Sequence, residues 1–464
     1  MSTSDPSLGT PAATNPWAKH AVSVRETRKG TAFAFLAWVF AVYDFILFGT
    51  LLPAIGKDMG WSPATATGVS TAVSVGTALV VLGVGPLVDR IGRRKGMLLT
   101  VSGTAVASGL TALTMSAGYL VGVRSIAGLG LAEQGVNTTY LNEIYAVSQD
   151  EAIKKRRGFI YSIVQGGWPL GVLSAAGFAA VFLPLVGWRG CFLLATFPAI
   201  VIVLLRRKLQ ETPQFLIDQK IRQLKKEGRA DEAAAMSAEY GLDAGRATPL
   251  VEIFSKEARR NTIMLSIAWI TNWFGITTFA ILGTTVLSSA TGKNVDFADA
   301  LIMFVIINLV GFTGYLFHGW AGDRFGRRNV IGIGWLISGV LFALMLLVAH
   351  SPASVVTLYS LGMFFLVGPY AALLFYMGEC YETDCRATGA SLLNAMSQPG
   401  AIVAGLIITA MLAAGATWIN AALYVGVIGT LVSGVVMFGA KKVTALEAID
   451  TSMVPVGSHG SHLS

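Results

Sequence analysis

Apolar residues fill this chain in long runs that short polar segments interrupt. We count twelve runs, and most are close to the length of about 20 residues that an α-helix needs to cross a bilayer. The first six are predicted at residues 31–55, 66–87, 96–115, 119–141, 158–185 and 191–205. The other six are predicted at residues 261–287, 297–320, 330–349, 355–377, 389–413 and 418–439. The pattern predicts an all-α polytopic membrane protein with twelve transmembrane helices.

The polar segments divide the chain into five predicted units. Two tails flank two six-helix bundles, and a linker rich in Lys, Arg, Glu and Ala joins the bundles. The linker pattern predicts short amphipathic helices. The units are a disordered tail at 1–30, a bundle at 31–205, the linker at 206–260, a bundle at 261–439 and a tail at 440–464.

Composition narrows the functional classes. Charged residues make up 13% of the 464 residues and hydrophobic residues 54%, whereas a soluble domain carries about 25% charged residues. This argues against a soluble enzyme, a nucleic-acid-binding protein and a disordered scaffold. Three cysteines are too few for a disulfide framework. The runs contain no His-rich cluster, Ser-His-Asp spacing or phosphate-binding loop, so we expect no metal, no cofactor and no enzymatic activity.

Lys and Arg residues gather in alternate loops, at 90–95, 154–157 and 324–328. Short cytoplasmic loops carry such an excess, so these loops, the linker and both tails are predicted to lie inside the cell. The net charge of +8 then reflects topology rather than a nucleic-acid partner. Three loop cations fall outside: Lys57, Arg189 and Lys293. We expect a monomer in the plasma membrane with both termini in the cytoplasm.

One loop motif occurs twice. Residues 85–95 have the sequence Gly-Pro-Leu-Val-Asp-Arg-Ile-Gly-Arg-Arg-Lys, and residues 319–328 have Gly-Trp-Ala-Gly-Asp-Arg-Phe-Gly-Arg-Arg. A Glu-x-Tyr element, at Glu143 and again at Glu379, follows each copy at a nearly constant separation. A motif that repeats at the same place in both sets of six runs indicates an internal duplication, as many transporters show.

The first copy resembles the Gly-x-Leu-x-Asp-Arg-x-Gly-Arg-Arg signature of the major facilitator superfamily, and the second copy departs from it at Ala321. The resemblance implies two pseudo-symmetric bundles that expose a shared midplane site to each side in turn. In that superfamily the loop holds the cytoplasmic gate. Its aspartate can cap a neighbouring helix, and its glycines let helices approach. The implied gate residues are Gly85, Asp89, Arg90, Gly92, Arg93, Glu143, Asp323, Arg324, Gly326, Arg327, Glu379 and Arg386.

Three ionisable residues fall inside the predicted helices: Asp44, Arg124 and Glu133. A charge at the bilayer centre costs about 2.5–3.5 kcal/mol on insertion scales, so each needs a partner or a function. Arg124 keeps its proton and requires an anion. Since the first and fourth helices face each other across the cavity in the resembled superfamily, we expect that anion to be Asp44. The pair is either a proton switch or a static ion pair; alternatively, Asp44 caps a broken helix.

As a switch, the pair would couple substrate to protons. An anionic substrate on Arg124 deprives Asp44 of its partner in a dry site, which favours the protonated acid. Glu133 lies about 180° around its helix from Arg124 and shares a face with Asn137. That stripe either lines the cavity, with Glu133 as a second proton-coupling residue, or bonds to a neighbouring helix.

Further polar and aromatic residues lie in runs that line the cavity of the resembled superfamily. Each is a candidate substrate contact, and an interhelical hydrogen bond is the alternative for each. With Arg124 and Asn137, the substrate-binding candidates are Gln165, Asn272, Trp273, Tyr370, Asn394 and Gln398. We expect Arg124 to meet a carboxylate and the aromatic side chains to pack against the body of the substrate.

Two further segments bear on the substrate. Residues 43–49, Tyr-Asp-Phe-Ile-Leu-Phe-Gly, resemble the first-helix segment of proton-coupled symporters for metabolites, aromatic acids and sialate. Residues 211–216 are similar to a stretch of the sugar porters, in a degraded form. The resemblance implies proton-coupled uptake of a small organic anion such as a carboxylate. A sugar or polyol porter, a drug–proton antiporter and a transporter-like receptor are the alternatives.

Overall fold

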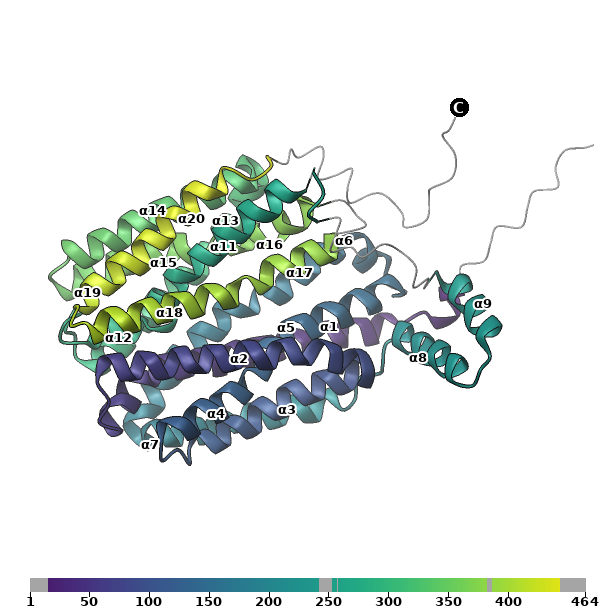
Figure 1. Ribbon diagram of the computed structural model, residues 1–464, viewed down its shortest axis with the longest axis horizontal. Helices are drawn as coiled ribbons and strands as arrows, with labels where there is room; N and C mark the ends of the chain where they lie inside the picture. The colour runs from purple at the N-terminus through teal and green to yellow at the C-terminus, as the bar shows by residue number, and fades with distance from the viewer. Residues whose placement is uncertain (1–15, 242–252, 257, 382–385, 443–464) are drawn as a thin grey trace, which may run out of the picture.

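The computed structural model describes residues 16–241, 253–256, 258–381 and 386–442. Within these ranges the regular elements are helices, together with one isolated backbone bridge between Val22 and Ser148. The long helices run side by side, with those of the first half of the chain (purple to blue) and those of the second half (green to yellow) forming two adjoining groups (Figure 1). The predicted all-α class is confirmed.

The first half contains η1 (Pro16–His20), α1 (Val24–Asp58), α2 (Pro63–Ile91), α3 (Arg93–Thr111), α4 (Ala117–Ala127), α5 (Leu129–Ala146), α6 (Glu151–Gln165) and α7 (Gly167–Arg206). Two linker helices follow, α8 (Pro213–Lys226) and α9 (Ala230–Tyr240). The second half contains α11 (Arg259–Gly275), η2 (Ile276–Ile281), α12 (Gly283–Ser288), α13 (Phe297–Phe325), α14 (Arg327–Leu347), α15 (Pro352–Val367), α16 (Tyr370–Glu379), α17 (Arg386–Ala395), α18 (Ser397–Ala413), α19 (Trp418–Ala421), η3 (Ala422–Val427) and α20 (Ile428–Met437).

Local sequence determines where several helices begin. Ser62, Ser116 and Ser351 precede α2, α4 and α15, and each hydroxyl accepts a hydrogen bond from the backbone N–H three residues later. Such caps satisfy N–H groups that the first helical turn leaves unpaired. Pro63 and Pro352 follow two of these caps, at the helical position where the missing N–H of proline costs nothing.

Nine helices in the described part of the chain are long and apolar enough to cross a bilayer. The element α7 consists of two helices that meet at a kink at Gly187, where φ is 67° and the backbone is not helical, so the predicted break between the fifth and sixth runs is confirmed. The predicted fourth run is divided at Gly128 into α4 and α5, of 11 and 18 residues. The chain is therefore a multi-pass all-α membrane protein, and the count of twelve spans stays a prediction.

The helices extend beyond two of the predicted boundaries. α1 begins at Val24, before the predicted start of the first bundle at 31. α7 ends with Arg206, which the sequence assigns to the linker but which is fully buried. α8 and α9 are the short helices expected in the linker. Of the predicted tails, residues 1–15 and 443–464 lie outside the described residues.

The two halves meet closely at one end of the bundle. The Thr284 hydroxyl of α12 donates a hydrogen bond to the Thr50 carbonyl of α1 at 3.0 Å. A Cβ added at Gly49 would stand 2.3 Å from the carbonyl oxygen of Ile281, so the approach requires glycine. We call this the far end, and the opposite end, which carries both loop motifs, the motif end. Along the sides of the bundle, α2 packs on α18 and α7 on α13.

Candidate functional site

Asp44 and Arg124 form an ion pair inside the first half. The Nη2 atom of Arg124 lies 3.0 Å from Oδ2 of Asp44 and 2.9 Å from the Asp44 carbonyl oxygen. Ser108 of α3 donates a hydrogen bond to the other carboxylate oxygen and accepts one from Arg124 at 3.5 Å. Asp44 is 1% exposed and Arg124 is 3% exposed. The structure thus brings together the two residues that the sequence pairs.

Aromatic rings enclose this ion pair. The ring centroids of Phe48 and Phe192 lie 5.3 and 5.1 Å from the guanidinium carbon of Arg124, a distance at which a cation attracts a ring face. Asp44, Ser108 and the two rings contact the guanidinium, whose buried Nε–H has no acceptor among the described residues.

A second buried ion pair lies closer to the motif end. The Nη1 atom of Arg206 stands 2.5 Å from Oε1 of Glu133, and both residues are fully buried. Thr100 donates a hydrogen bond to the other oxygen of Glu133. Arg206 also donates to Oδ1 of Asn137 at 2.8 Å, and Asn137 donates to the Ala34 carbonyl at 3.1 Å. These contacts are the bonds to neighbouring helices that were one of the two alternatives for this stripe.

Arg206 is a residue that the sequence analysis does not single out. It follows an apolar run and stands next to Arg207, which is typical of cations at a membrane boundary. Glu133 is the feature of the sequence that could have pointed to Arg206, because a buried carboxylate requires a cation on an adjoining helix.

Five aromatic side chains form a continuous row across both halves, which we call the aromatic row. Between ring centroids, Trp38 of α1 lies 6.1 Å from Trp168 of α7, and Trp168 lies 6.1 Å from Trp273 of α11. Trp269 lies 6.4 Å from Trp273 and 4.9 Å from Tyr370 of α16. All five side chains are buried. The row includes two of the predicted substrate contacts, Trp273 and Tyr370.

Several N–H groups at this row have no acceptor among the residues that the structure describes. They are the indole nitrogens of Trp38, Trp168 and Trp273 and the amide nitrogen of Asn272. The Asn272 oxygen accepts a hydrogen bond from the Tyr370 hydroxyl at 2.6 Å. Since the large majority of buried polar groups are hydrogen-bonded, these four donors are candidates for contact with a ligand that carries acceptors.

The remaining predicted contacts lie in a chain of amides between the halves. Asn394 of α17 donates a hydrogen bond to Gln134 of α5 at 2.9 Å, and Gln134 donates to Gln165 of α6 at 3.0 Å. Gln165 donates to the Tyr161 hydroxyl at 2.5 Å. The structure therefore joins Gln165 and Asn394 through Gln134, which the sequence analysis does not single out. Gln398 is half-buried in α18.

The first loop motif builds a charged cluster at the start of α3. Arg93 lies 3.2 Å from Asp89 and 3.0 Å from Glu143 of α5. Thr212, after α7, donates a second hydrogen bond to Glu143. Burial raises the pKa of the Glu143 carboxyl, while the Thr212 hydroxyl and Arg93 oppose that shift. We call Asp89, Arg93 and Glu143 the first motif cluster.

The acid at the N-terminus of α3 is Glu211, from the linker. The backbone N–H groups of Arg93 and Arg94 donate to its carboxylate at 3.0 and 3.1 Å, and the helix dipole favours an anion there. Gly92, with φ of 101°, allows the approach, since a Cβ would stand 2.3 Å from the same carboxylate. The expectation that Asp89 caps a helix is wrong, because Asp89 is exposed and bound to Arg93.

The second loop motif builds the same arrangement. Arg327 contacts Asp323 at 2.8 Å and also contacts Glu379 of α16. Gly326, with φ of 88°, stands between α13 and α14 as Gly92 stands between α2 and α3. We call Asp323, Arg327 and Glu379 the second motif cluster.

The other predicted gate residues lie outside these clusters. Gly85 and Arg90 are exposed on α2, and a Cβ at Gly85 would meet nothing within 4 Å, so Gly85 does not serve a close helix approach. The Arg324 guanidinium lies 5.9 Å from the ring centroid of Trp320. The side chain of Arg386 lies outside the described residues.

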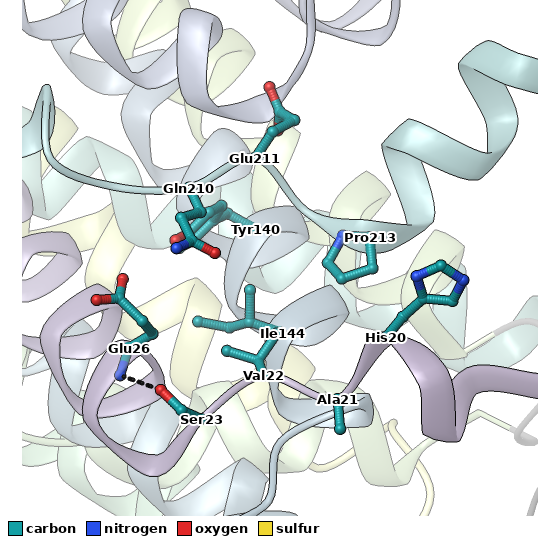
Figure 2. Close-up of a pocket in the computed structure, with 10 residues that line it drawn as sticks. All are labelled: His20, Ala21, Val22, Ser23, Glu26, Tyr140, Ile144, Gln210, Glu211 and Pro213. Carbon is teal, nitrogen blue, oxygen red and sulfur yellow. Dashed lines mark hydrogen bonds between the residues drawn. The ribbon is translucent and has the colours of Figure 1, made fainter.

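A hollow of about 330 Å³ lies beside the first motif cluster. Its walls come from the segment before α1, from α5 and from the start of the linker, as Figure 2 shows for Ser23, Tyr140 and Glu211. Two of its carboxylates, Glu26 and Glu211, contact Lys29 and the α3 N-terminus. The hollow therefore borders the first motif cluster, and no residue of the aromatic row lines it.

Comparison with protein families identifies the fold family. A family model described as sugar (and other) transporter matches residues 18–452, nearly the whole chain. The chain belongs to this family of the major facilitator superfamily. The two charged motif clusters and the all-helical, multi-pass fold agree with that membership.

Several relatives of this major facilitator protein bear transporter names. It is 25% identical over 385 residues to a putative niacin/nicotinamide transporter of Bacillus subtilis, which covers 82% of this chain and 88% of the relative. It is 25% identical over 400 residues to a niacin transporter of Acinetobacter baylyi, covering 82% and 86%. It is 26% identical over 386 residues to a gentisate transporter of Corynebacterium glutamicum, covering 80% and 78%. Each match spans most of both chains.

Within this major facilitator protein, α1 connects three features. It carries Trp38 of the aromatic row, Asp44 of the ion pair and Gly49 at the far-end contact. Asp44 could be found from the sequence because a carboxylate in an apolar run is conspicuous. Trp38 could not, because an indole in such a run gives no signal of which helix its ring meets.

Proposed function

We propose that this protein imports small aromatic carboxylates by proton-coupled alternating access, in the plasma membrane with its motif end in the cytoplasm. Membership of a transporter family supports secondary transport of a small molecule. The names of two relatives, for niacin and for gentisate, refer to carboxylates on six-membered aromatic rings. The alternating Lys and Arg content of the loops supports the orientation.

The aromatic row is the observation that carries this proposal. Its rings come from α1 and α7 on one side and from α11 and α16 on the other. Aromatic rings attract one another at centroid separations of about 4.5–7 Å, so the row suits a flat aromatic substrate. A sugar would instead require several side chains that bond to hydroxyl groups. A site shared by both halves is what alternating access needs.

Asp44 is the proposed proton carrier. Protonation would remove the negative charge from the enclosed pair and weaken the hold of Arg124 on α1. The far-end contact of Gly49 and Thr50 with Ile281 and Thr284 lies little more than one helical turn further along α1. Loss of the ion pair would thus free α1 to leave that contact and open the aromatic row to the far side. Deprotonation toward the motif side would restore the pair and close the far end.

Uptake into liposomes tests the proposed function. The purified protein is reconstituted, an inward proton gradient is imposed, and labelled nicotinate, gentisate and glucose are offered separately. We expect both acids to accumulate above their external concentrations and glucose to stay at the level of empty liposomes. Accumulation of glucose alone would establish a sugar porter, and extrusion of the acids against the proton gradient would establish an antiporter.

A further inference from the structure

The unpaired donors at the aromatic row point to the way the substrate is held. We propose that uncharged N–H groups of Trp38, Trp168, Trp273 and Asn272 bind the substrate carboxylate, and that Arg124 does not. This inference rests on the proposed function, because it names the group of an aromatic acid that the site recognises.

The four donors belong to neighbouring side chains. Trp168 lies between Trp38 and Trp273, 6.1 Å from each by ring centroids, and Asn272 directly precedes Trp273 on α11. Each donor nitrogen is buried without an acceptor among the described residues. A carboxylate offers about four lone-pair sites on its two oxygens, so one carboxylate has enough acceptors for all four N–H groups.

The Tyr370 hydroxyl sets the orientation of the Asn272 amide. It occupies the Asn272 oxygen at 2.6 Å, which leaves the amide nitrogen as the free end. The ring of Tyr370 lies against Trp269 at a centroid distance of 4.9 Å. The amide nitrogen therefore remains available to donate to a ligand at the row.

Arg124 is already occupied by an anion of the protein. Its guanidinium contacts the Asp44 carboxylate and the Asp44 carbonyl, and the ring centroids of Phe48 and Phe192 lie 5.3 and 5.1 Å from its central carbon. A substrate that took Arg124 would first have to displace the Asp44 carboxylate, which lies 3.0 Å from the guanidinium. Neutral donors at the row hold the carboxylate without disturbing that pair, so Asp44 remains available for the proton.

Trp→Phe substitutions test the inference, because they remove one N–H and keep an aromatic ring. Binding of labelled benzoate to the purified protein is measured at pH 7 for Trp38→Phe, Trp168→Phe and Trp273→Phe. We expect each dissociation constant to rise about tenfold, the effect of losing one hydrogen bond to a charged group. Thermal unfolding of each variant checks that it remains folded.

Trp418→Phe is the matched control. Trp418 also has a buried indole N–H without an acceptor among the described residues, but it lies in α19, outside the aromatic row. We expect its benzoate affinity to stay within about twofold of the wild type. The inference is overturned if the three row variants bind benzoate as the wild type does, or if Trp418→Phe loses as much affinity as they do.

A double variant tests the second part of the inference. Asp44→Asn with Arg124→Gln removes both charges of the ion pair together, which avoids an unpaired buried charge. We expect it to lose proton-driven accumulation and to keep benzoate binding. Loss of benzoate binding in a folded double variant would show that Arg124 holds the carboxylate. If the wild type binds none of benzoate, nicotinate and gentisate, the proposed function fails, and this inference fails with it.

Discussion

Two buried acid–arginine pairs lie in the first half, and their neighbours differ. Besides Glu133 and Asn137, Arg206 donates to the carbonyl oxygens of Met97 at 3.1 Å and Phe33 at 3.4 Å. It thus fastens α1, α3 and α5 to the end of α7. Arg124 has fewer polar partners and is flanked by rings. We infer that the Glu133–Arg206 pair is a fixed structural contact and that the Asp44–Arg124 pair is the one that opens.

Glu133→Gln is predicted to destabilise the protein. The substitution leaves the buried Arg206 charge uncompensated, which costs about 3–5 kcal/mol when one partner of a buried pair is removed. Thermal unfolding in detergent measures the loss. Adding Arg206→Met should recover a large part of it, because no buried charge then remains. A variant as stable as the wild type that lacks proton-driven uptake would instead make Glu133 a coupling residue.

At the residue scale, the sequence predicts which isolated charges form a pair better than it predicts which other side chains surround them. Asp44 and Arg124 could be paired because each is an isolated charge in an apolar run, and such charges require partners. Arg206 could not be recognised, because its burial depends on how far α7 extends. The unpaired indole nitrogens depend on side-chain directions that the run pattern does not contain.

At the scale of elements, the linker holds the start of α3 in place. Glu211 binds the N-terminus of α3, and Thr212 binds Glu143 of α5. Arg222 of α8 donates a hydrogen bond to the Asp89 carbonyl at 3.0 Å. These contacts all lie at the first motif cluster. The linker therefore acts on one motif cluster through described contacts that involve α2, α3 and α5.

Glu211→Gln is predicted to weaken this attachment. The carboxylate at the α3 N-terminus stabilises the helix end by an amount typical of caps, about 0.5–2 kcal/mol, and an amide retains only part of that. Thermal unfolding should show the loss. Glu227→Gln, at an exposed linker carboxylate that pairs with Arg229, is the control and should leave the midpoint unchanged. Equal midpoints for both variants would show that Glu211 does not hold α3.

Glu143 is predicted to make stability depend on pH. Burial raises the pKa of its carboxyl, so the folded protein binds the proton more tightly than the unfolded chain does. The contribution of Glu143 to stability is therefore greatest below the ordinary carboxyl pKa. It decreases as the pH rises through the raised pKa of the folded protein. Unfolding midpoints of the wild type and Glu143→Gln are measured from pH 4 to 7. As the pH rises, the midpoint of the variant should increase relative to that of the wild type. A difference that moves the other way contradicts the assigned shift.

The run pattern predicts which segments are helical but not every contact at the helix ends. The predicted break between the fifth and sixth runs is present, because Gly187 adopts a positive, non-helical φ of 67°. The motif loops were predicted as clusters because their charges repeat. The acid at the N-terminus of α3 could not be predicted, since Glu211 is distant in sequence and only the fold brings it there.

At the scale of the whole molecule, the far end is closed by contacts between α1 and the segment of η2 and α12. Gly49 lies against the Ile281 carbonyl, and Thr284 bonds to Thr50. The same α1 carries Asp44 and Trp38. The proposed substrate site, the proposed proton carrier and the far-end contact therefore all involve one helix, an arrangement that suits coupled transport.

Gly49→Ala is predicted to favour an open far end. The added methyl would stand 2.3 Å from the Ile281 carbonyl oxygen, a separation that no closed arrangement tolerates. A cysteine introduced at Thr284 should become more reactive toward a membrane-impermeant thiol reagent. Gly56→Ala is the control on the same helix, because its Cβ would meet its nearest neighbour, Ala66, at an ordinary 3.7 Å. Unchanged labelling in Gly49→Ala would show that this contact does not close the far end.

The most direct measurement compares uptake of labelled nicotinate by the wild type and by Asp44→Asn in two assays. The first uses liposomes loaded with unlabelled nicotinate, and the second uses empty liposomes under an inward proton gradient. The amide that replaces the Asp44 carboxylate cannot carry a proton, so the variant should exchange labelled for unlabelled nicotinate yet fail to accumulate it when the gradient is imposed. The wild type should do both. Gradient-driven accumulation by the Asp44→Asn variant, at the level of the wild type, would contradict the account.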